Sequence, residues 1–238
     1  MNSKDFLSYC EQTKFIEGFA RLFNSTAHSD VTLYLGQNQV KLHAHYVILS
    51  ARTHYFDKAK DGGFKESTTD EFHLSEHDSY ALYRMMQYIY MGDYSHKKGL
   101  VLEEADEQEL FMHARVYVLA NYFDVDGLKG LCAAKISRCT IFQEDLDSLV
   151  ESIAEIYSIR NPCFSMRQTI STKVKKDMKK LYEKKSFRKL LRQNAEFASD
   201  VIRVLMGKGN FYADPDSDSD IDSDIGSFDA GPIGSSHI

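Results

Sequence analysis

The sequence of 238 residues predicts an α+β domain that is followed by an all-α extension and an acidic tail. Three observations lead to this prediction. Apolar residues alternate over two short segments that are joined by a turn, which is typical of a β-hairpin. Apolar residues recur at helical spacing through most of the remaining chain. Residues 212–238 contain seven Asp, no Lys or Arg and few apolar side chains, so we expect this tail to be disordered.

The first predicted element is an N-terminal helix, which ends at residue 24. Phe15, Phe19 and Phe23 recur every four residues and form one apolar stripe along it. An exposed apolar stripe of this kind marks an interface, so we expect it to mediate homodimerisation. The alternative is that the stripe folds back on the chain's own core.

The α+β domain is predicted over residues 25–138. Its hairpin comprises residues 30–35 and 39–43, with a turn at Gly36. The further elements, in chain order, are helices over residues 46–50 and 53–60, a strand over residues 71–74, and helices over residues 75–90, 104–122 and 126–137. Ser75 and Asp78 are candidate N-caps of the helix that ends at Gly92.

From residue 139 onward the periodicity predicts only helices, so residues 139–211 form the extension. These helices are expected over residues 141–157, 166–181, 187–191 and 195–206, the last one with Asn194 as its N-cap. Twelve basic and two acidic side chains give residues 160–192 a charge of +10, although the whole chain carries −6. We interpret the basic residues as the solvated face of amphipathic helices. The alternatives are a patch for nucleic acid or nuclear import, or a docking site for the acidic tail.

Several classes of protein are disfavoured by composition and motifs. No apolar run approaches the 18 residues of a membrane span, and the N-terminus lacks the pattern of a signal peptide. The four cysteines, which match neither a disulfide framework nor a zinc signature, are Cys10, Cys132, Cys139 and Cys163. We therefore expect reduced thiols and a cytoplasmic or nuclear location.

The sequence also lacks the motifs of the common catalytic and cofactor sites. His43, His45 and His54 do not have the spacing of zinc ligands. A glycine-rich phosphate loop and a nucleophile motif are both missing from the sequence. We expect no enzyme activity, no catalytic residues, no metal and no cofactor.

Four segments together resemble the BTB/POZ domain family, in the order of that family: Ser29–Val31, Leu42–Phe56, Tyr88–Tyr94 and Val118–Leu128. The family pattern runs S-D-V, then H-x-x-x-L-x-x-x-S-x-x-F, then Y-x-Y-T-G-x-Y, then A-x-x-Y-x-V-x-x-L. The resemblance implies a small β-sheet flanked by a cluster of short helices, and a function in protein–protein interaction. The later helices resemble the helical extension of standalone filamentous-fungal BTB proteins.

Two polar residues in these segments are expected to build the fold. Asp30 precedes the first strand, where it can accept backbone donors, and a buried His45 can bridge backbone groups. In transcription-repressing relatives a basic residue follows the histidine and partners the aspartate in a charged pocket. Tyr46 stands at that position here, which counts against a co-repressor pocket. Met91 replaces the usual Thr, which is a mild change.

The triplet Phe64-Lys65-Glu66 is the sharpest functional feature. BTB domains that bind cullin-type ubiquitin-ligase scaffolds carry an apolar-x-Glu triplet between the second short helix and the next strand. The resemblance therefore implies that Phe64 and Glu66 contact a cullin, and that the helix over residues 141–157 widens this contact. The alternative is that Phe64 covers the domain's own core and that Glu66 is a surface charge.

The sequence therefore predicts a protein–protein interaction adaptor, with a cullin-based ubiquitin ligase as its expected partner. The alternative function is a nuclear or transcriptional regulator that uses the basic C-terminal helices. Binding of single-stranded nucleic acid is disfavoured because no aromatic residues are interleaved with the basic ones as stacking platforms. In the acidic tail, Ser217 and Ser219 each have an Asp three positions later, so we expect phosphorylation there by acid-directed kinases.

Overall fold

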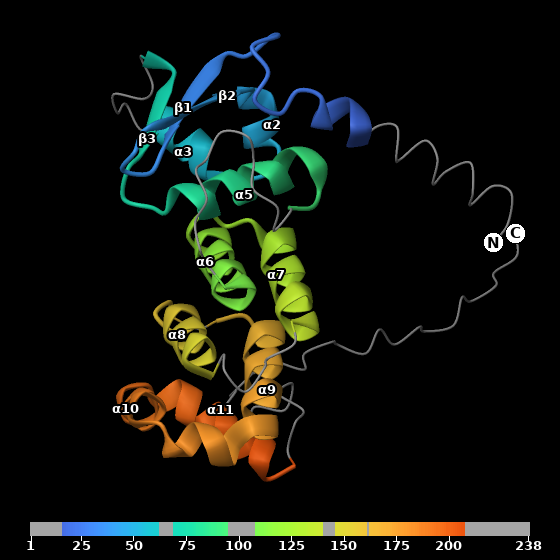
Figure 1. Ribbon diagram of the computed structural model, residues 1–238. Helices are drawn as coiled ribbons and strands as arrows, with labels where there is room; N and C mark the ends of the chain where they lie inside the picture. Colours follow the sequence, from blue (N-terminus) through green and yellow to red (C-terminus); the bar gives the residue numbers. More distant parts are fainter. Residues whose placement is uncertain (1–15, 62–68, 95–107, 140–145, 161, 208–238) are drawn as a thin grey trace, which may run out of the picture.

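The computed structural model describes residues 16–61, 69–94, 108–139, 146–160 and 162–207. Its elements stack in chain order, from a small sheet at one end to the last pair of helices at the other (Figure 1). The predicted order, an α+β domain followed by further helices, is confirmed. Among the described residues, no helix is long and apolar enough to cross a membrane.

The sheet has three strands in the order β2-β1-β3: β1 (Val31–Leu35), β2 (Val40–Ala44) and β3 (Glu71–Leu74). β1 and β2 form the predicted antiparallel hairpin, and β3 runs parallel to β1. Val31, Leu33 and Leu35 are buried, whereas the residues between them on β1 are only partly buried. This alternation fits a strand that turns one face to the core.

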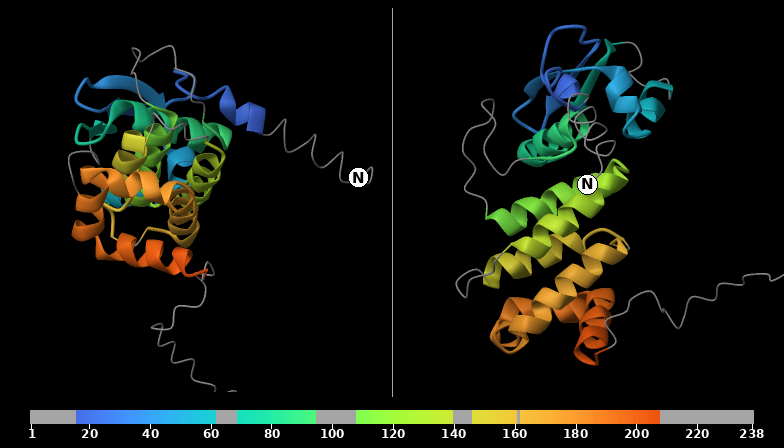
Figure 2. Two further views of the ribbon diagram at one scale, coloured as in Figure 1. Left: turned by 60° about the horizontal axis from the view of Figure 1, so that its bottom comes forward. Right: turned by 90° about the vertical axis from the view of Figure 1, so that its right-hand side faces the viewer.

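The helices of the domain are α2 (Tyr46–Ser50), α3 (Tyr55–Asp61), α5 (Ser79–Met91), α6 (Glu109–Tyr122) and α7 (Asp126–Arg138). α5 lies under the sheet, and α6 and α7 lie on the other side of α5 (Figures 1 and 2). Asp78 caps α5, as predicted, by accepting the N–H of Ala81 at 2.8 Å. Gly92 ends the helix in the left-handed conformation, with a φ of 74°.

The turn after β1 requires a glycine. Gly36 has a φ of +64°, and a Cβ at this position would collide with the side chain of Ser79. The Ser79 hydroxyl donates to the carbonyl of Leu35 at 3.2 Å. The first turn of α5 is therefore held directly against the end of β1.

Both polar residues that were expected to build the fold do so. The carboxylate of Asp30 accepts the N–H of Tyr46 at 2.7 Å, at the start of α2. His45 is buried, with its Nε2 2.9 Å from the carbonyl of Ala27 and its Nδ1 3.0 Å from the hydroxyl of Tyr90. One ring nitrogen of His45 thus contacts a backbone carbonyl, as expected. The other contacts a tyrosine side chain on α5 in place of a second backbone group.

The N-terminal helix ends earlier than predicted. Residues 16–20 are helical and residues 21–24 form a turn. The N–H of Leu22 donates to the carbonyl of Phe19, three residues back instead of four, so the chain tightens and leaves the helix. Asn24 then adopts a φ of 52°.

The extension consists of α8 (Leu146–Ile156), α9 (Phe164–Glu183), α10 (Lys185–Gln193) and α11 (Ala195–Leu205). α8 packs on α6, and α9 packs on α7 and α11, so these helices continue the stack (Figure 2). Asp177 has non-helical angles and kinks α9, which the periodicity did not predict. Asn194 caps α11, as predicted, by accepting the N–H of Phe197 at 2.8 Å.

A buried carboxylate fastens the extension together. Asp200 on α11 is fully buried and accepts two hydrogen bonds from Arg167 on α9, at 2.8 and 2.6 Å. It also accepts the hydroxyl of Tyr157, just after α8, at 2.8 Å. The hydrogen bonds to Asp200 raise the pKa of Arg167, and burial raises the pKa of Tyr157, so the first stays charged and the second neutral. One aspartate therefore joins three segments.

Candidate protein-interaction surface

The residues predicted to contact a cullin, Phe64 and Glu66, lie outside the described residues. The two ends of their connection are described. The ammonium of Lys60, near the end of α3, pairs with the carboxylate of Asp70, one residue before β3, at 3.0 Å. The carbonyl of Asp70 accepts the N–H of Thr32 on β1 at 3.0 Å. The connection therefore leaves and re-enters the domain at two neighbouring, hydrogen-bonded points.

A cluster of aromatic rings lies beside the start of α3. Tyr55 contacts both Phe123, at 4.4 Å between ring centroids, and Tyr122, at 5.9 Å. His77 packs on Tyr122 at 4.5 Å, and burial lowers its pKa, so its imidazole is neutral at pH 7. Tyr122 is nevertheless 54% exposed. An exposed tyrosine with rigid neighbours is the type of residue that anchors interfaces. Sequence reasoning missed it, because its spacing on α6 resembles that of a core residue.

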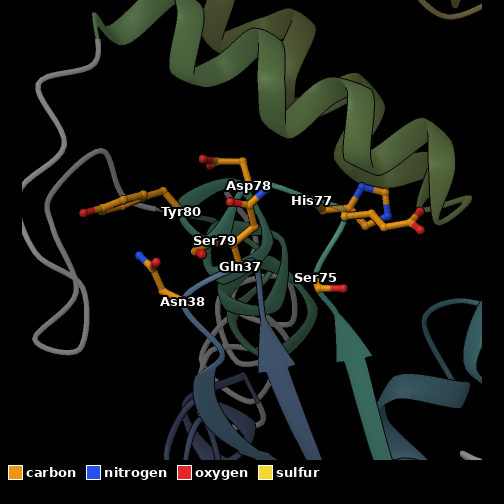
Figure 3. Close-up of a pocket in the computed structure, with 8 residues that line it drawn as sticks. Gln37, Asn38, Ser75, His77, Asp78, Ser79 and Tyr80 are labelled. Atoms are coloured by element: carbon orange, nitrogen blue, oxygen red, sulfur yellow. The ribbon is translucent and has the colours of Figure 1, made fainter.

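A polar pocket of about 310 Å³ adjoins His77 at the end of the sheet, between the β1–β2 turn and the start of α5. Figure 3 shows His77 on one side of it and Tyr80 on the other. Asp78 caps α5 and pairs with Arg115 at 3.2 Å, and Ser79 donates to a backbone carbonyl. A catalytic nucleophile must be paired with a base. Among these described lining residues, the hydroxyl of Ser79 is instead bonded to a backbone carbonyl.

Tyr46, at the position where repressing relatives carry a cation, is neutral. Its hydroxyl donates to Asp57 at 2.8 Å, and this hydrogen bond raises the pKa of Tyr46 to about 12. The backbone N–H of Tyr46 donates a hydrogen bond to the carboxylate of Asp30. The ammonium of Lys60 lies over the Tyr46 ring, 4.1 Å from the centroid. Asp30 thus accepts a backbone N–H, and the neighbouring side chain is a neutral tyrosine, in agreement with the expectation that counts against a charged co-repressor pocket.

The apolar stripe of the N-terminal helix packs, where it is described, on the domain itself. Phe15 lies outside the described residues, while Phe19 and Phe23 are partly buried against the core. The ring of Phe23 meets those of Tyr83 and Tyr90 edge-on, at 5.3 and 5.8 Å. Phe23 therefore packs against the chain's own core, which is the alternative stated for the apolar stripe.

Two other apolar side chains are more exposed than Phe19 and Phe23, and so more accessible to a second copy of the chain. Ile16, on the helix of residues 16–20, is 46% exposed, and Val47 on α2 is 71% exposed. The sequence places Ile16 beside the apolar stripe and Val47 in the helix over residues 46–50, but their exposure follows only from the fold.

Several basic side chains of the extension have backbone partners. The ammonium of Lys173 donates to the carbonyl of Cys139 at 2.7 Å, and that of Lys175 donates to the carbonyl of Val204 at 3.2 Å. Arg188 donates to two carbonyls at the end of α9, at 2.5 and 2.8 Å. Cations at the C-terminal ends of helices are stabilising, so these residues serve the fold. The exposed Lys176, Lys179 and Lys180 instead fit the interpretation of a solvated helix face.

The remaining predicted residues are dispersed or undescribed. Among the described residues, His43, His45 and His54 form no common group of metal ligands, and His54 has a side chain 83% exposed. Cys10 and the predicted phosphorylation sites, Ser217 and Ser219, lie outside the described residues. The described cysteines, all free thiols, are Cys132, Cys139 and Cys163.

Comparison with known proteins places these features in one family. The sequence model of the BTB/POZ domain family matches residues 19–140 of this chain, which hold the sheet and the helices α2 to α7. A BTB/POZ domain-containing protein of Arabidopsis thaliana is 25% identical over 149 residues. The match covers 61% of this chain and 18% of the relative, so the chain spans less than a fifth of that relative's length.

Proposed function

Because this chain belongs to the BTB/POZ domain family, a family of protein-interaction domains, we propose that it is an adaptor that docks on a cullin-type scaffold of a ubiquitin ligase. The triplet Phe64-Lys65-Glu66 is the observation that carries this proposal. It stands between α3 and β3, where cullin-binding BTB domains carry an apolar-x-Glu triplet. In the proposed complex Phe64 enters an apolar groove of the scaffold and Glu66 pairs at its edge.

The anchoring of the triplet's connection supports the proposal. The ion pair between Lys60 and Asp70 holds the two ends of the connection together, at 3.0 Å. A loop with fixed ends has less conformational freedom to lose on binding, so more of the contact energy is left for affinity. Lys60→Ala should therefore weaken the complex without removing a contact residue.

The exposed aromatic ring beside α3 offers a second anchor. Tyr122 packs against Tyr55, the first residue of α3, and α3 leads into the triplet. α8, which falls within the helix expected to widen the contact, packs on α6, the helix that ends at Tyr122. We propose that the exposed side chain of Glu151 on α8 extends the same surface, next to Asp147, whose carboxylate pairs with Lys184 at 2.7 Å.

The alternative, a nuclear regulator that approaches nucleic acid, has one observation in its favour. Lys176, Lys179 and Lys180 are exposed and line a groove of about 500 Å³ along α9. The contacts of Lys173 and Lys175 with helix-end carbonyls speak against it, because they assign part of the basic segment to the fold.

Calorimetric titration of the full chain against a cullin N-terminal domain tests the proposal. Truncating a buried aromatic anchor removes about 2 kcal/mol or more, so Phe64→Ala should weaken binding roughly 30-fold. Glu66→Ala should have a smaller effect, because it acts nearer the rim. Tyr182→Ala is the matched control, since this tyrosine is 56% exposed but lies on α9 in the extension.

Three results would contradict the proposal. If the wild-type chain does not bind at tens of micromolar, the scaffold is not its partner. If Phe64→Ala binds as well as the wild type, the triplet is only surface. If Phe64→Ala unfolds the chain, Phe64 covers the domain's own core.

A further inference from the structure

At the junction of the BTB domain and the extension, a buried histidine faces a carboxylate and a thiol. Glu109 and His113 stand four residues apart on α6, and Cys139 directly follows α7. One potential ligand atom from each of the three lies within 4.8 Å of the other two. The Nε2 of His113 is 3.6 Å from the Oε1 of Glu109, which is longer than a hydrogen bond.

The other ring nitrogen of this histidine is held in place. The Nδ1 of His113 lies 2.8 Å from the hydroxyl of Tyr94, which is itself 3.4 Å from the thiol of Cys132. The ammonium of Lys135 donates to the carbonyl of Tyr94 at 3.1 Å and so fixes that residue. Histidines that bind zinc typically have their second nitrogen held in this way, which orients the ring. The Nε2 is thereby directed toward Glu109.

From this geometry we propose that Glu109, His113 and Cys139 bind a zinc ion, with water in the fourth position. Zinc takes nitrogen, sulfur and oxygen ligands tetrahedrally at about 2.0 to 2.3 Å, which sets the ligand atoms about 3.3 to 3.7 Å apart. The pair of His113 and Glu109 already has this separation. The two separations that involve Cys139 are at most 4.8 Å, so each needs to close by no more than about 1 to 1.5 Å, which rotation of the Cys139 and Glu109 side chains supplies. The side chain of Glu109 is 58% exposed and free to make this movement.

The charges of the cluster favour zinc over other ions. A carboxylate and a thiolate together neutralise a divalent cation, so the bound ion does not repel the nearby ammonium groups of Lys135 and Lys173. Calcium and magnesium prefer all-oxygen sites, whereas imidazole and thiolate select zinc. The thiol of Cys139, which donates to the carbonyl of Lys135 at 3.4 Å, loses its proton to solvent when it binds.

The bound ion would cross-link the start of α6 to the end of α7. Cys139 is also the residue whose carbonyl accepts Lys173 from α9. Zinc binding would therefore stabilise the place where the BTB domain meets its extension, a function independent of the cullin contact. The spacing of Glu109 and His113, four residues apart on one helix face, is the signal in the sequence; the cysteine is added only by the fold.

Titration of Co²⁺ into the full chain tests the site, after removal of metals with a chelator and in the presence of a reductant. We expect one Co²⁺ per chain, a thiolate-to-cobalt charge-transfer band in the near ultraviolet, visible bands of tetrahedral cobalt, and displacement of both by Zn²⁺. Cys139→Ser should abolish the charge-transfer band. Cys163→Ser is the matched control, because it removes another partly buried thiol and should leave the band unchanged.

Glu109→Gln provides a second variant, which does not disturb the buried histidine. It should weaken Co²⁺ binding at least about 10-fold, as is typical when a zinc site is perturbed. Zn²⁺ should raise the melting temperature of the wild type, and raise that of Glu109→Gln less. The proposal is overturned if the wild type gives no charge-transfer band, if Cys139→Ser retains the band, or if Cys163→Ser loses it.

Discussion

Replacing Asp200 by Asn tests whether one buried carboxylate fastens the extension. The substitution keeps the size of the side chain and removes its charge. It leaves the guanidinium of Arg167 beside an amide and weakens three hydrogen bonds of 2.6 to 2.8 Å. Because Asp200 is fully buried, no water is available to replace the lost acceptor.

The expected loss of stability is about 3 kcal/mol, at the lower end of the 3 to 5 kcal/mol that follows removal of one partner from a buried ion pair. The lower end applies because the side chain of Arg167 is 27% exposed and keeps a second partner, Glu196, at 3.3 Å. Tyr157→Phe removes only one hydrogen bond and should destabilise the chain by about 1 kcal/mol.

Urea unfolding followed by far-UV circular dichroism measures these differences. With a slope of about 3 kcal/mol per molar urea, Asp200→Asn should lower the midpoint by about 1 M. Glu196→Gln is the matched control, since it removes a partly exposed partner of the same arginine and should change the free energy of unfolding by less than about 1 kcal/mol. If Asp200→Asn is no less stable than Glu196→Gln, the buried pair does not hold the extension together.

Three further predictions concern assembly, the tail and pH. Light scattering at micromolar concentration should give the mass of a dimer. Ile16→Asp should give the mass of a monomer, because it replaces an apolar side chain that is 46% exposed with a charged one. Intact-mass analysis of protein from its native source should show phosphate on Ser217 or Ser219, each phosphate adding about −1.5 to −2 charge. Burial lowers the pKa of His77 below its unfolded value of about 6.5, so the free energy of unfolding should fall as the pH falls below 6.5.

Each of these predictions has a contradicting result. A monomeric wild type whose mass Ile16→Asp leaves unchanged would show that this apolar side chain is not an interface. An unmodified tail under all growth conditions would contradict the predicted phosphorylation of Ser217 and Ser219. His77→Gln should reduce the loss of stability between pH 7 and pH 5. If the loss is the same in this variant, protonation of His77 is not its cause.

The sequence was a good guide to the domain wherever local chemistry decides the structure. The hairpin, the strand Glu71–Leu74, the caps Asp78 and Asn194 and the stop at Gly92 all appear as predicted. Each depends on residues within a few positions in the chain, such as an alternating apolar pattern or a side chain that reaches its own helix. The early end of the N-terminal helix was missed, because Asn24 leaves it to bond with the backbone of β2.

The candidate sites depend on contacts between distant segments, which periodicity does not report. Tyr122 occupies a helical position typical of a core residue, yet lies exposed because α6 ends there beside α3. Cys139 meets Glu109 and His113 only because α7 runs alongside α6. Phe64 and Glu66 came from resemblance to a family, and their environment lies outside the described residues.

Affinity purification of the full chain from its source cells, with quantitative mass spectrometry, tests the adaptor proposal most directly. The wild type and Phe64→Ala serve as baits in parallel, with Tyr182→Ala as the control. The proposal predicts that a cullin scaffold co-purifies with the wild type and with Tyr182→Ala, and is depleted at least about 10-fold with Phe64→Ala. Equal recovery of the scaffold by all three baits, or recovery of chromatin proteins without a cullin, would contradict it.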